Sequence, residues 1–162
     1  MSTRSLIFKK NNDGSYVGVY CHNDGYPTGV GQILYNFYNE ERTTRLIELG
    51  SMSSLGCFIE PQQNGIRTKY ESTPNGFDLL PIITSKHTFD EPQDNVCVFY
   101  NRDRNEELHN YQLKNFEDLL ELFKDSWAEY VYVLQDNQWF FLDNNLYKLK
   151  SLKEELHNEA LL

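Results

Sequence analysis

Two stretches of the chain alternate apolar and polar residues with the period of two that is typical of β-strands. The first covers residues 5–9 and 16–22, which are separated at 11–14 by Asn-Asn-Asp-Gly, a sequence that favours a tight hairpin turn. The second covers residues 129–134 and 138–143, with Gln-Asp-Asn between them. The pattern therefore predicts two β-hairpins.

Apolar residues spaced three and four apart predict two helices in the N-terminal half. The first follows Pro27, a residue that suits the first turn of a helix. Its apolar face is formed by Val30, Ile33, Leu34, Phe37 and Tyr38. The second is predicted over residues 42–49 and ends at Gly50, because glycine readily adopts the backbone conformation found after a helix.

The same spacing predicts two helices in the C-terminal half. One begins after Asn115, whose side chain is a good N-cap. Its apolar face is predicted to consist of Phe116, Leu119, Leu120, Phe123 and Trp127. The tail over residues 146–161 carries Leu149, Leu152 and Leu156 at helical spacing.

Between the two halves, residues 56–94 are irregular and are punctuated by Gly, Pro and Asn. Short strands are predicted there and just beyond, at residues 57–60, 66–71, 79–84, 95–100 and 108–113. Two hairpins, each followed by a helix, predict an α+β fold in which a mixed or antiparallel sheet carries helices on one or both faces. We expect residues 1–162 to form a single domain of this kind.

Composition limits the classes of function. The chain has 162 residues, 40% of them hydrophobic, which is enough for one sizeable core. It carries 15 Lys and Arg against 24 Asp and Glu, a net charge of −9 that repels nucleic acids, so we expect no direct nucleic-acid binding. The N-terminal apolar run is too short for a signal peptide or a membrane span. We therefore expect a cytoplasmic protein without a membrane partner.

The three cysteines, Cys21, Cys57 and Cys97, are widely spaced, without a CxxC pair or a Cys and His cluster at zinc-site spacing. No GxxxxGK[ST] or GxGxxG nucleotide motif occurs either. We therefore expect no disulfide framework, no metal and no cofactor, which fits a reducing cytosol.

The densest polar cluster covers residues 20–27, between a predicted strand and a predicted helix, where mixed folds often place binding sites. Because side chains alternate along a strand, Cys21 and His22 point to opposite faces, which favours a core cysteine over a nucleophile. His22 and Asp24 share a face if the strand continues, and together would make a general base. Alternatively, Asp24 caps the turn or the helix and His22 bonds to the backbone.

Gly29 and Gly31 open the following helix, although each glycine costs about 0.5–1 kcal/mol relative to alanine inside a helix. Either another element packs closely against this turn, or its exposed N–H groups receive an anion. Close packing is the favoured interpretation, because glycine content alone is a weak signal for a nucleotide.

The second polar cluster covers residues 100–106 and includes an Arg-Asp-Arg sequence. Its two arginines offer forked donors for a carboxylate or a phosphate, although such a sequence at the end of a strand more often forms a surface ion-pair network. If the two clusters meet, they form one site for a small anionic molecule or a protein partner. The residues of that predicted site are His22, Asp24, Tyr26, Arg102 and Arg104.

Aromatic residues are abundant, with 11 Tyr and 10 Phe. A surplus on an exposed face would suit protein recognition, because Tyr and Trp are frequent interface anchors. Combined with the charge of −9, it also raises the hypothesis of an acidic surface that imitates nucleic acid and occupies a host protein's DNA or RNA site. Plain solubility is the alternative explanation of the charge.

Several runs carry a resemblance to known proteins. The Tyr-Cys-His-Asn-Asp-Gly-Tyr-Pro run at 20–27, the Gly-Val-Gly run at 29–31 and the Tyr-Asn-Arg-Asp-Arg run at 100–104 resemble a family of small proteins encoded by bacteriophages and prophages. Further similar runs span nearly the whole chain. In relatives the residue after the histidine is often Trp, and Asn23 departs from that pattern. The resemblance implies a bacterial cytoplasm, where small accessory proteins bind and disable host or defence components.

Two hypotheses follow. In the first, the protein is a phage or prophage accessory protein that binds a host or defence protein, or a small signalling molecule. In the second, it is a small hydrolase or nucleotide-modifying enzyme, with His22 and Asp24 as the base and Arg102 as the anion binder. The sequence holds no catalytic triad, metal set or cofactor motif that favours turnover. A virion component is disfavoured because neither repeats nor long oligomerising helices occur.

Overall fold

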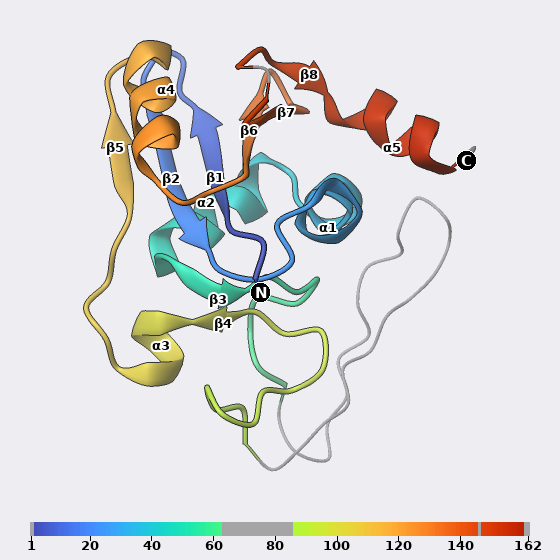
Figure 1. Cartoon of the computed structure of the whole chain (residues 1–162). Coiled ribbons are helices and arrows are strands. Elements are labelled where there is room, and N and C mark those ends of the chain that lie inside the picture. Colours follow the sequence, from blue (N-terminus) through green and yellow to red (C-terminus); the bar gives the residue numbers. More distant parts are fainter. Residues whose placement is uncertain (1, 63–85, 146, 161–162) are drawn as a thin grey trace.

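The computed structural model describes residues 2–62, 86–145 and 147–160. Within these ranges the chain forms one eight-stranded sheet with helices on both faces (Figure 1). The strands are β1 (Ser5–Lys10), β2 (Tyr16–Cys21), β3 (Met52–Ser54), β4 (Val98–Phe99), β5 (Tyr111–Leu113), β6 (Tyr130–Gln135), β7 (Gln138–Asp143) and β8 (Lys150–Ser151). The helices are the π-helical turn η1 (Pro27–Gly31), α1 (Gln32–Phe37), α2 (Glu40–Leu49), α3 (Tyr100–Arg104), α4 (Phe116–Asp125) and α5 (Leu152–Ala160).

Both predicted hairpins are present and lie side by side in the sheet. β1 pairs antiparallel with β2 and parallel with β6, which gives the strand order β4-β3-β2-β1-β6-β7-β8, with β5 also paired to β2. Asp136 and Asn137 in the second turn have φ angles of 51° and 60°, which Asp and Asn tolerate in tight hairpins. The predicted α+β fold with a mixed sheet is therefore confirmed.

Alternation along the strands gives the sheet two apolar faces. Ile7 and Val19 belong to one face, which α1, α2 and α5 cover, and which we call the three-helix face. Leu6 and Phe8 belong to the other, which α4 covers and which we call the α4 face (Figure 1). The helices add to these two cores the buried side chains of Leu34, Leu46, Leu152, Leu119 and Phe123.

The predicted helices form, but the helix predicted within 146–161 is shortened to α5, because Lys150 and Ser151 form β8, and Leu149 packs on the α4 face whereas Leu152 packs on the three-helix face. The other helices differ only slightly at their ends. α2 begins at Glu40, two residues earlier than predicted, because the Asn39 side chain caps it, and it ends before Gly50, whose φ is 92°. α4 begins after Asn115 as predicted, and the Asn115 side chain accepts a hydrogen bond from the backbone N–H of Asp118 at 2.9 Å.

Trp127 does not belong to the apolar face of α4, and that prediction is wrong. α4 ends at Asp125, because Ser126 adopts an extended conformation with φ −86° and ψ 168°. The Ser126 hydroxyl then accepts a hydrogen bond from the N–H of Ala128 at 3.2 Å, and the chain turns toward β6. Trp127 is consequently left 83% exposed.

The region after β3 differs most from the prediction. Residues 57–60 do not form a strand; Phe58 makes one isolated parallel bridge with Val96, outside the strands of the sheet. The strands predicted at 66–71 and 79–84 lie outside the described residues.

The strand predicted at 95–100 is shortened to β4, because Tyr100 begins the short helix α3, which the sequence did not indicate. The strand predicted at 108–113 is shortened to β5. None of the helices in the described ranges has the length and apolarity needed to cross a membrane.

Candidate functional site

His22 and Asp24 have different hydrogen-bond partners. The His22 Nδ1 atom lies 2.7 Å from the Tyr20 hydroxyl, whereas Asp24 Oδ1 accepts a hydrogen bond from the Tyr26 hydroxyl at 3.2 Å. Asp24 has a φ of 57°, so the chain has left the extended conformation that would have kept the two side chains on one face. Among the described hydrogen bonds and ion pairs, none joins His22 to Asp24 as a general base would require.

Cys21 is a core residue, as the alternation along β2 predicts. Its side chain is fully buried on the three-helix face, and this burial raises the pKa of its thiol to about 12. Because the thiolate is the nucleophilic form, Cys21 is unreactive at neutral pH.

Close packing explains the two glycines at the start of the helix. A Cβ atom on Gly29 would overlap the carbonyl oxygen of Asp24, and a Cβ on Gly31 would lie 3.0 Å from the ring of Tyr132. The favoured interpretation of these glycines, a close approach of neighbouring chain segments, is confirmed.

Arg102 is bonded to its own protein. Its Nη1 donates to the carbonyl oxygen of Ile59 at 2.7 Å, its Nη2 to that of Cys97 at 2.9 Å, and its Nε to Asp103 Oδ1 at 2.9 Å. These bonds connect α3 to the loop that follows β3. The guanidinium therefore acts as a structural tie, and the donors that an anion would need are already used.

Asp103 is the centre of this buried network. Its side chain is 4% exposed, and Oδ2 accepts a hydrogen bond from the N–H of Phe99 at 2.9 Å and lies 3.4 Å from His87 Nε2. Burial alone would raise the pKa of Asp103, but the hydrogen bonds from His87, Arg102 and Phe99 lower it to about 2. The His87 Nδ1 atom accepts from the N–H of Gln93 at 2.9 Å, so both ring nitrogens are engaged.

The remaining predicted site residues are more exposed. Arg104 forms an ion pair with Glu106 at 3.2 Å, and its guanidinium lies 4.6 Å from the centre of the Phe89 ring. Tyr26 is 41% exposed at the turn before η1. Arg102 and Arg104 are thus on one short helix, and Asp24 and Tyr26 share one turn.

The two polar clusters do meet, but through other residues. The Asn23 side chain donates to the carbonyl oxygen of Ser53 at 2.9 Å and to its hydroxyl at 3.2 Å. The Tyr100 side chain also forms a hydrogen bond with Ser53. β3 therefore joins the clusters through Asn23 and Tyr100, which the sequence did not single out.

A different group of polar and aromatic side chains lies where α4 leaves its face of the sheet uncovered, at the carboxyl end of β2 (Figure 1). The first hairpin brings part of the group together: Ser5 pairs with Cys21, and continuing this register by one residue places Arg4, just before β1, opposite His22, just after β2. We call this group the open sheet end. Its members are Arg4, Tyr20, His22, His109 and Tyr111.

Tyr111 and His109 come from β5 and the loop before it. Tyr111 pairs with Gly18 of β2, and because Gly18 has no side chain, the ring of Phe8 lies over it. Tyr111 packs against Phe8 with ring centroids 6.1 Å apart, and the His109 ring meets Tyr111 edge-on at 4.6 Å. These contacts hold two aromatic rings at the rim of the open sheet end.

Arg4 is the cation of the open sheet end. Burial raises the pKa of Tyr20 and the positive charge of Arg4 opposes this, so the guanidinium lies within electrostatic reach of the Tyr20 hydroxyl. Arg4 Nε is buried and has no hydrogen-bond partner among the described residues. A buried donor of this kind is uncommon in folded proteins.

Trp127 lies in the loop beside the open sheet end. This loop is fixed to β1 by a hydrogen bond of 2.8 Å from the N–H of Glu129 to the carbonyl oxygen of Arg4. Trp127 is therefore two residues away in sequence from Glu129, which is bonded to the backbone of Arg4.

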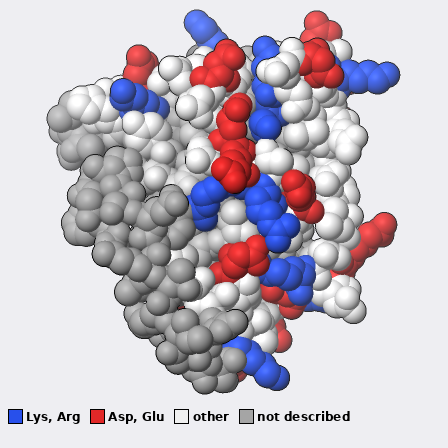
Figure 2. Space-filling view, turned by 180° about the vertical axis from the view of Figure 1, so that it is seen from behind, with Lys and Arg blue, Asp and Glu red and all other residues white. Residues whose placement is uncertain are grey.

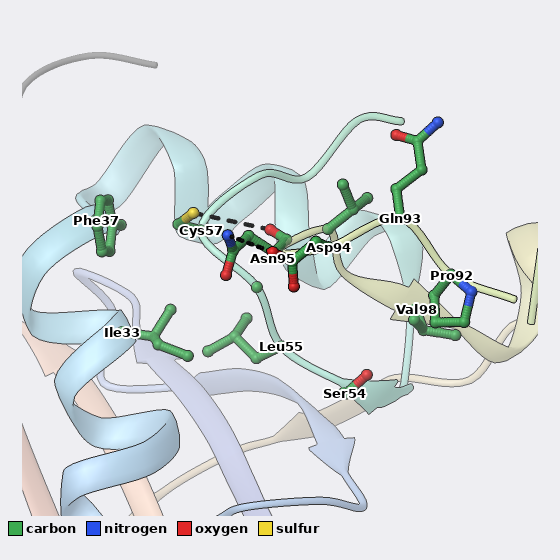
Figure 3. A pocket seen from close by; sticks show the side chains of 12 residues that line it. Ile33, Phe37, Ser54, Leu55, Cys57, Pro92, Gln93, Asp94, Asn95 and Val98 are labelled. Atoms are coloured by element: carbon green, nitrogen blue, oxygen red, sulfur yellow. Dashed lines mark hydrogen bonds between the residues drawn. The ribbon is translucent and has the colours of Figure 1, made fainter. Parts of the chain in front are cut away.

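A cavity of about 320 Å³ lies elsewhere, between α1 and the loops that follow β3 and precede β4. Ile33 and Leu55 form its apolar wall, and Cys57 and Asn95 lie across from them (Figure 3). Burial raises the pKa of the Cys57 thiol to about 11, so this cysteine is also protonated at neutral pH. The cavity contains a thiol but no activated nucleophile among its described lining residues.

Charges of both signs are mixed on the back of the molecule, where Lys and Arg side chains lie between Asp and Glu side chains (Figure 2). This face does not offer the continuous array of negative charge that imitation of nucleic acid would require.

Sequence reasoning identified His22 but missed the other members of the open sheet end. The pairing of the first hairpin would have placed Arg4 opposite His22, whereas no sequence signal indicated that β5 would bring His109 and Tyr111 beside them. In the described part of the chain, no three His, Cys, Asp or Glu side chains are grouped as metal ligands. The chain matches no protein-family model, no curated protein and no solved structure.

Proposed function

We propose that the protein is a phage or prophage accessory protein that acts in the bacterial cytoplasm by binding a host or defence protein. The observation that carries this proposal is the open sheet end with the adjacent Trp127, which is 83% exposed. Arg, Tyr and Trp are the residue types most enriched among the energetic anchors of protein interfaces. The resemblance to phage-encoded proteins supports the cellular setting.

The chemistry of the other candidate residues supports binding over turnover. Arg102 is engaged by its own protein, and the thiols of Cys21 and Cys57 have raised pKa values. A protein partner is favoured over nucleic acid because of the net charge of −9.

The proposal is tested by comparing the proteins that the wild type and its variants capture. An affinity-tagged chain is expressed in its bacterial host, and co-purified proteins are quantified by mass spectrometry for the wild type, Trp127→Ala and Tyr35→Ala. Tyr35 is a matched control, because it is an exposed aromatic residue, at 38%, on α1 and hence on the opposite side of the sheet. We expect one partner whose recovery falls at least about tenfold with Trp127→Ala, as for a residue worth 1.4 kcal/mol or more.

The same partner should be recovered undiminished with Tyr35→Ala. Equal recovery with wild type and Trp127→Ala, or equal loss with both variants, would contradict the proposal. Both variants should retain the wild-type melting temperature, because both side chains lie at the surface.

A further inference from the structure

Arg4 is a cation without a counter-charge among the residues that the structure describes. No hydrogen bond or ion pair joins its side chain to another described residue, and its Nε is shielded from water. Removing a guanidinium donor from water without giving it an acceptor is costly. An acceptor from outside cannot reach the shielded Nε itself, but Arg4 as a whole is only half-buried, so its charge remains open to a counter-charge from outside.

His22 supplies a second donor beside it. The Tyr20 hydroxyl lies 2.7 Å from His22 Nδ1, and as a phenol it is the natural donor to an imidazole nitrogen. In neutral His22 the proton is then on Nε2, which faces away from Tyr20. Arg4 and His22 are each one residue beyond the pair formed by Ser5 and Cys21, so continuing the register by one residue puts both donors on one face of the sheet. Tyr20 lies near both, because the charge of Arg4 acts on its hydroxyl and His22 Nδ1 lies 2.7 Å from it.

An oxyanion is the group that two adjacent N–H donors, one of them charged, recognise best. A nucleic acid would bring many phosphates to a chain with a net charge of −9. It would also meet the exposed carboxylates of Asp125 and Glu129 beside Trp127. A single carboxylate on a protein surface brings one charge only.

We infer that Arg4 and His22 together bind one carboxylate group, carried by an Asp or Glu side chain or the C-terminus of the protein partner. This inference rests on the proposed function for its partner. Tyr20 is a positioning residue, which keeps the Nε2 proton of His22 directed toward the ligand.

Sodium acetate is the probe. It is titrated into the ¹⁵N-labelled full chain at pH 7 and its binding is monitored by NMR, with sodium chloride added to hold the ionic strength constant. We expect saturable shifts of the Arg4 Nε–H and His22 ring signals with a Kd on the order of 10 mM, as suits so small a ligand. Inorganic phosphate is titrated in parallel. Non-saturable shifts, or phosphate binding tenfold tighter than acetate, would overturn the carboxylate assignment.

Variants distinguish acetate binding at a specific site from a general effect of positive charge on the protein. Arg4→Gln should abolish the saturable response of His22, and Arg4→Lys should weaken acetate binding about tenfold, because lysine keeps the charge and loses the planar fork. Arg45→Gln removes a cation from α2 on the other side of the sheet and should leave acetate binding unchanged. An unchanged His22 response in folded Arg4→Gln would overturn the inference.

The capture experiment distinguishes this inference from the function on which it rests. Acetate binding without a Trp127-dependent partner would support the carboxylate site and overturn the proposed function. A Trp127-dependent partner without acetate binding at Arg4 would support the function and overturn the carboxylate site.

Discussion

The side chains of Arg102 and Asp103 are neighbours in sequence and form an ion pair of 2.9 Å that is largely withdrawn from solvent. Charged residues that follow a strand usually lie at the surface, and there Arg102 would have been available to a ligand. Instead, the pair joins α3 to the carbonyl oxygens of Ile59 and Cys97. The arginine that the sequence offers for anion binding thus has a role in holding two loops together.

Because of the carboxyl group of Asp103, the free energy of unfolding should fall at acidic pH. Its pKa is 3.8 in the unfolded chain and about 2 in the folded protein, so folding favours the ionised form. This contribution, on the order of 2 kcal/mol, is complete above about pH 5 and is largely lost as the pH falls to about 2. Urea unfolding at pH 5 and pH 3 should show a larger loss of unfolding free energy for the wild type than for Asp103→Asn. The exposed Asp125→Asn serves as control, and equal losses in wild type and Asp103→Asn would refute the assignment.

Arg102→Lys should destabilise the protein although it keeps the charge. Lysine has no fork with which to reach Ile59, Cys97 and Asp103 together, so buried acceptors lose their donors. We expect a loss of about 2 kcal/mol and a fall in Tm of about 4–8 °C by calorimetry. Arg104→Lys is the matched control, because Arg104 is exposed and its ion pair contributes little. If Arg102→Lys has the same Tm as the wild type, the structural role assigned to Arg102 is wrong.

The elements that local patterns determine were predictable. Asn115 caps α4, Gly50 ends α2, and Asp136 with Asn137 turns the second hairpin, because each of these depends on residues within a few positions. Trp127 shows the limit of such patterns. Its helical spacing from the apolar face of α4 is correct, but Ser126 ends the helix first, and periodicity alone does not reveal that.

The candidate site was predictable only where it depends on one strand. The alternation along β2 correctly separated Cys21 from His22. The parallel contact between β1 and β6 and the pairing of β5 with β2 join segments about 90 to 125 residues apart in sequence. Tyr111 and Trp127 reach the site through these long-range pairings, which a single sequence does not encode in any local signal.

Gly29→Ala tests whether close packing, rather than helix propensity, governs the start of the first helix. In an open helix alanine would be favoured by about 1 kcal/mol. Here its Cβ would overlap the carbonyl oxygen of Asp24, which is backbone and cannot rotate away. We expect a loss of about 1–3 kcal/mol of unfolding free energy in urea, with the exposed neighbour Thr28→Ala close to wild type. A stabilised Gly29→Ala would show that the turn has room.

The two tryptophans should report opposite environments. Trp139 is 7% exposed and donates a hydrogen bond from Nε1 to the carbonyl oxygen of Tyr38 at 3.0 Å, whereas Trp127 is 83% exposed. In Trp139→Phe the remaining indole should emit at long wavelength and be quenched readily by acrylamide. In Trp127→Phe the emission should be blue-shifted and protected.

Replacing each tryptophan by alanine should have different effects on the stability of the protein. Trp139→Ala removes a buried ring and should cost about 3–5 kcal/mol, while Trp127→Ala should stay within about 0.5 kcal/mol of the wild type in urea. A fold gains little stability from a tryptophan that stays in water, so an unchanged stability of Trp127→Ala is what the docking role proposed for Trp127 requires. A strongly destabilised Trp127→Ala would instead assign the indole to the fold and remove the main support for a docking surface at the open sheet end.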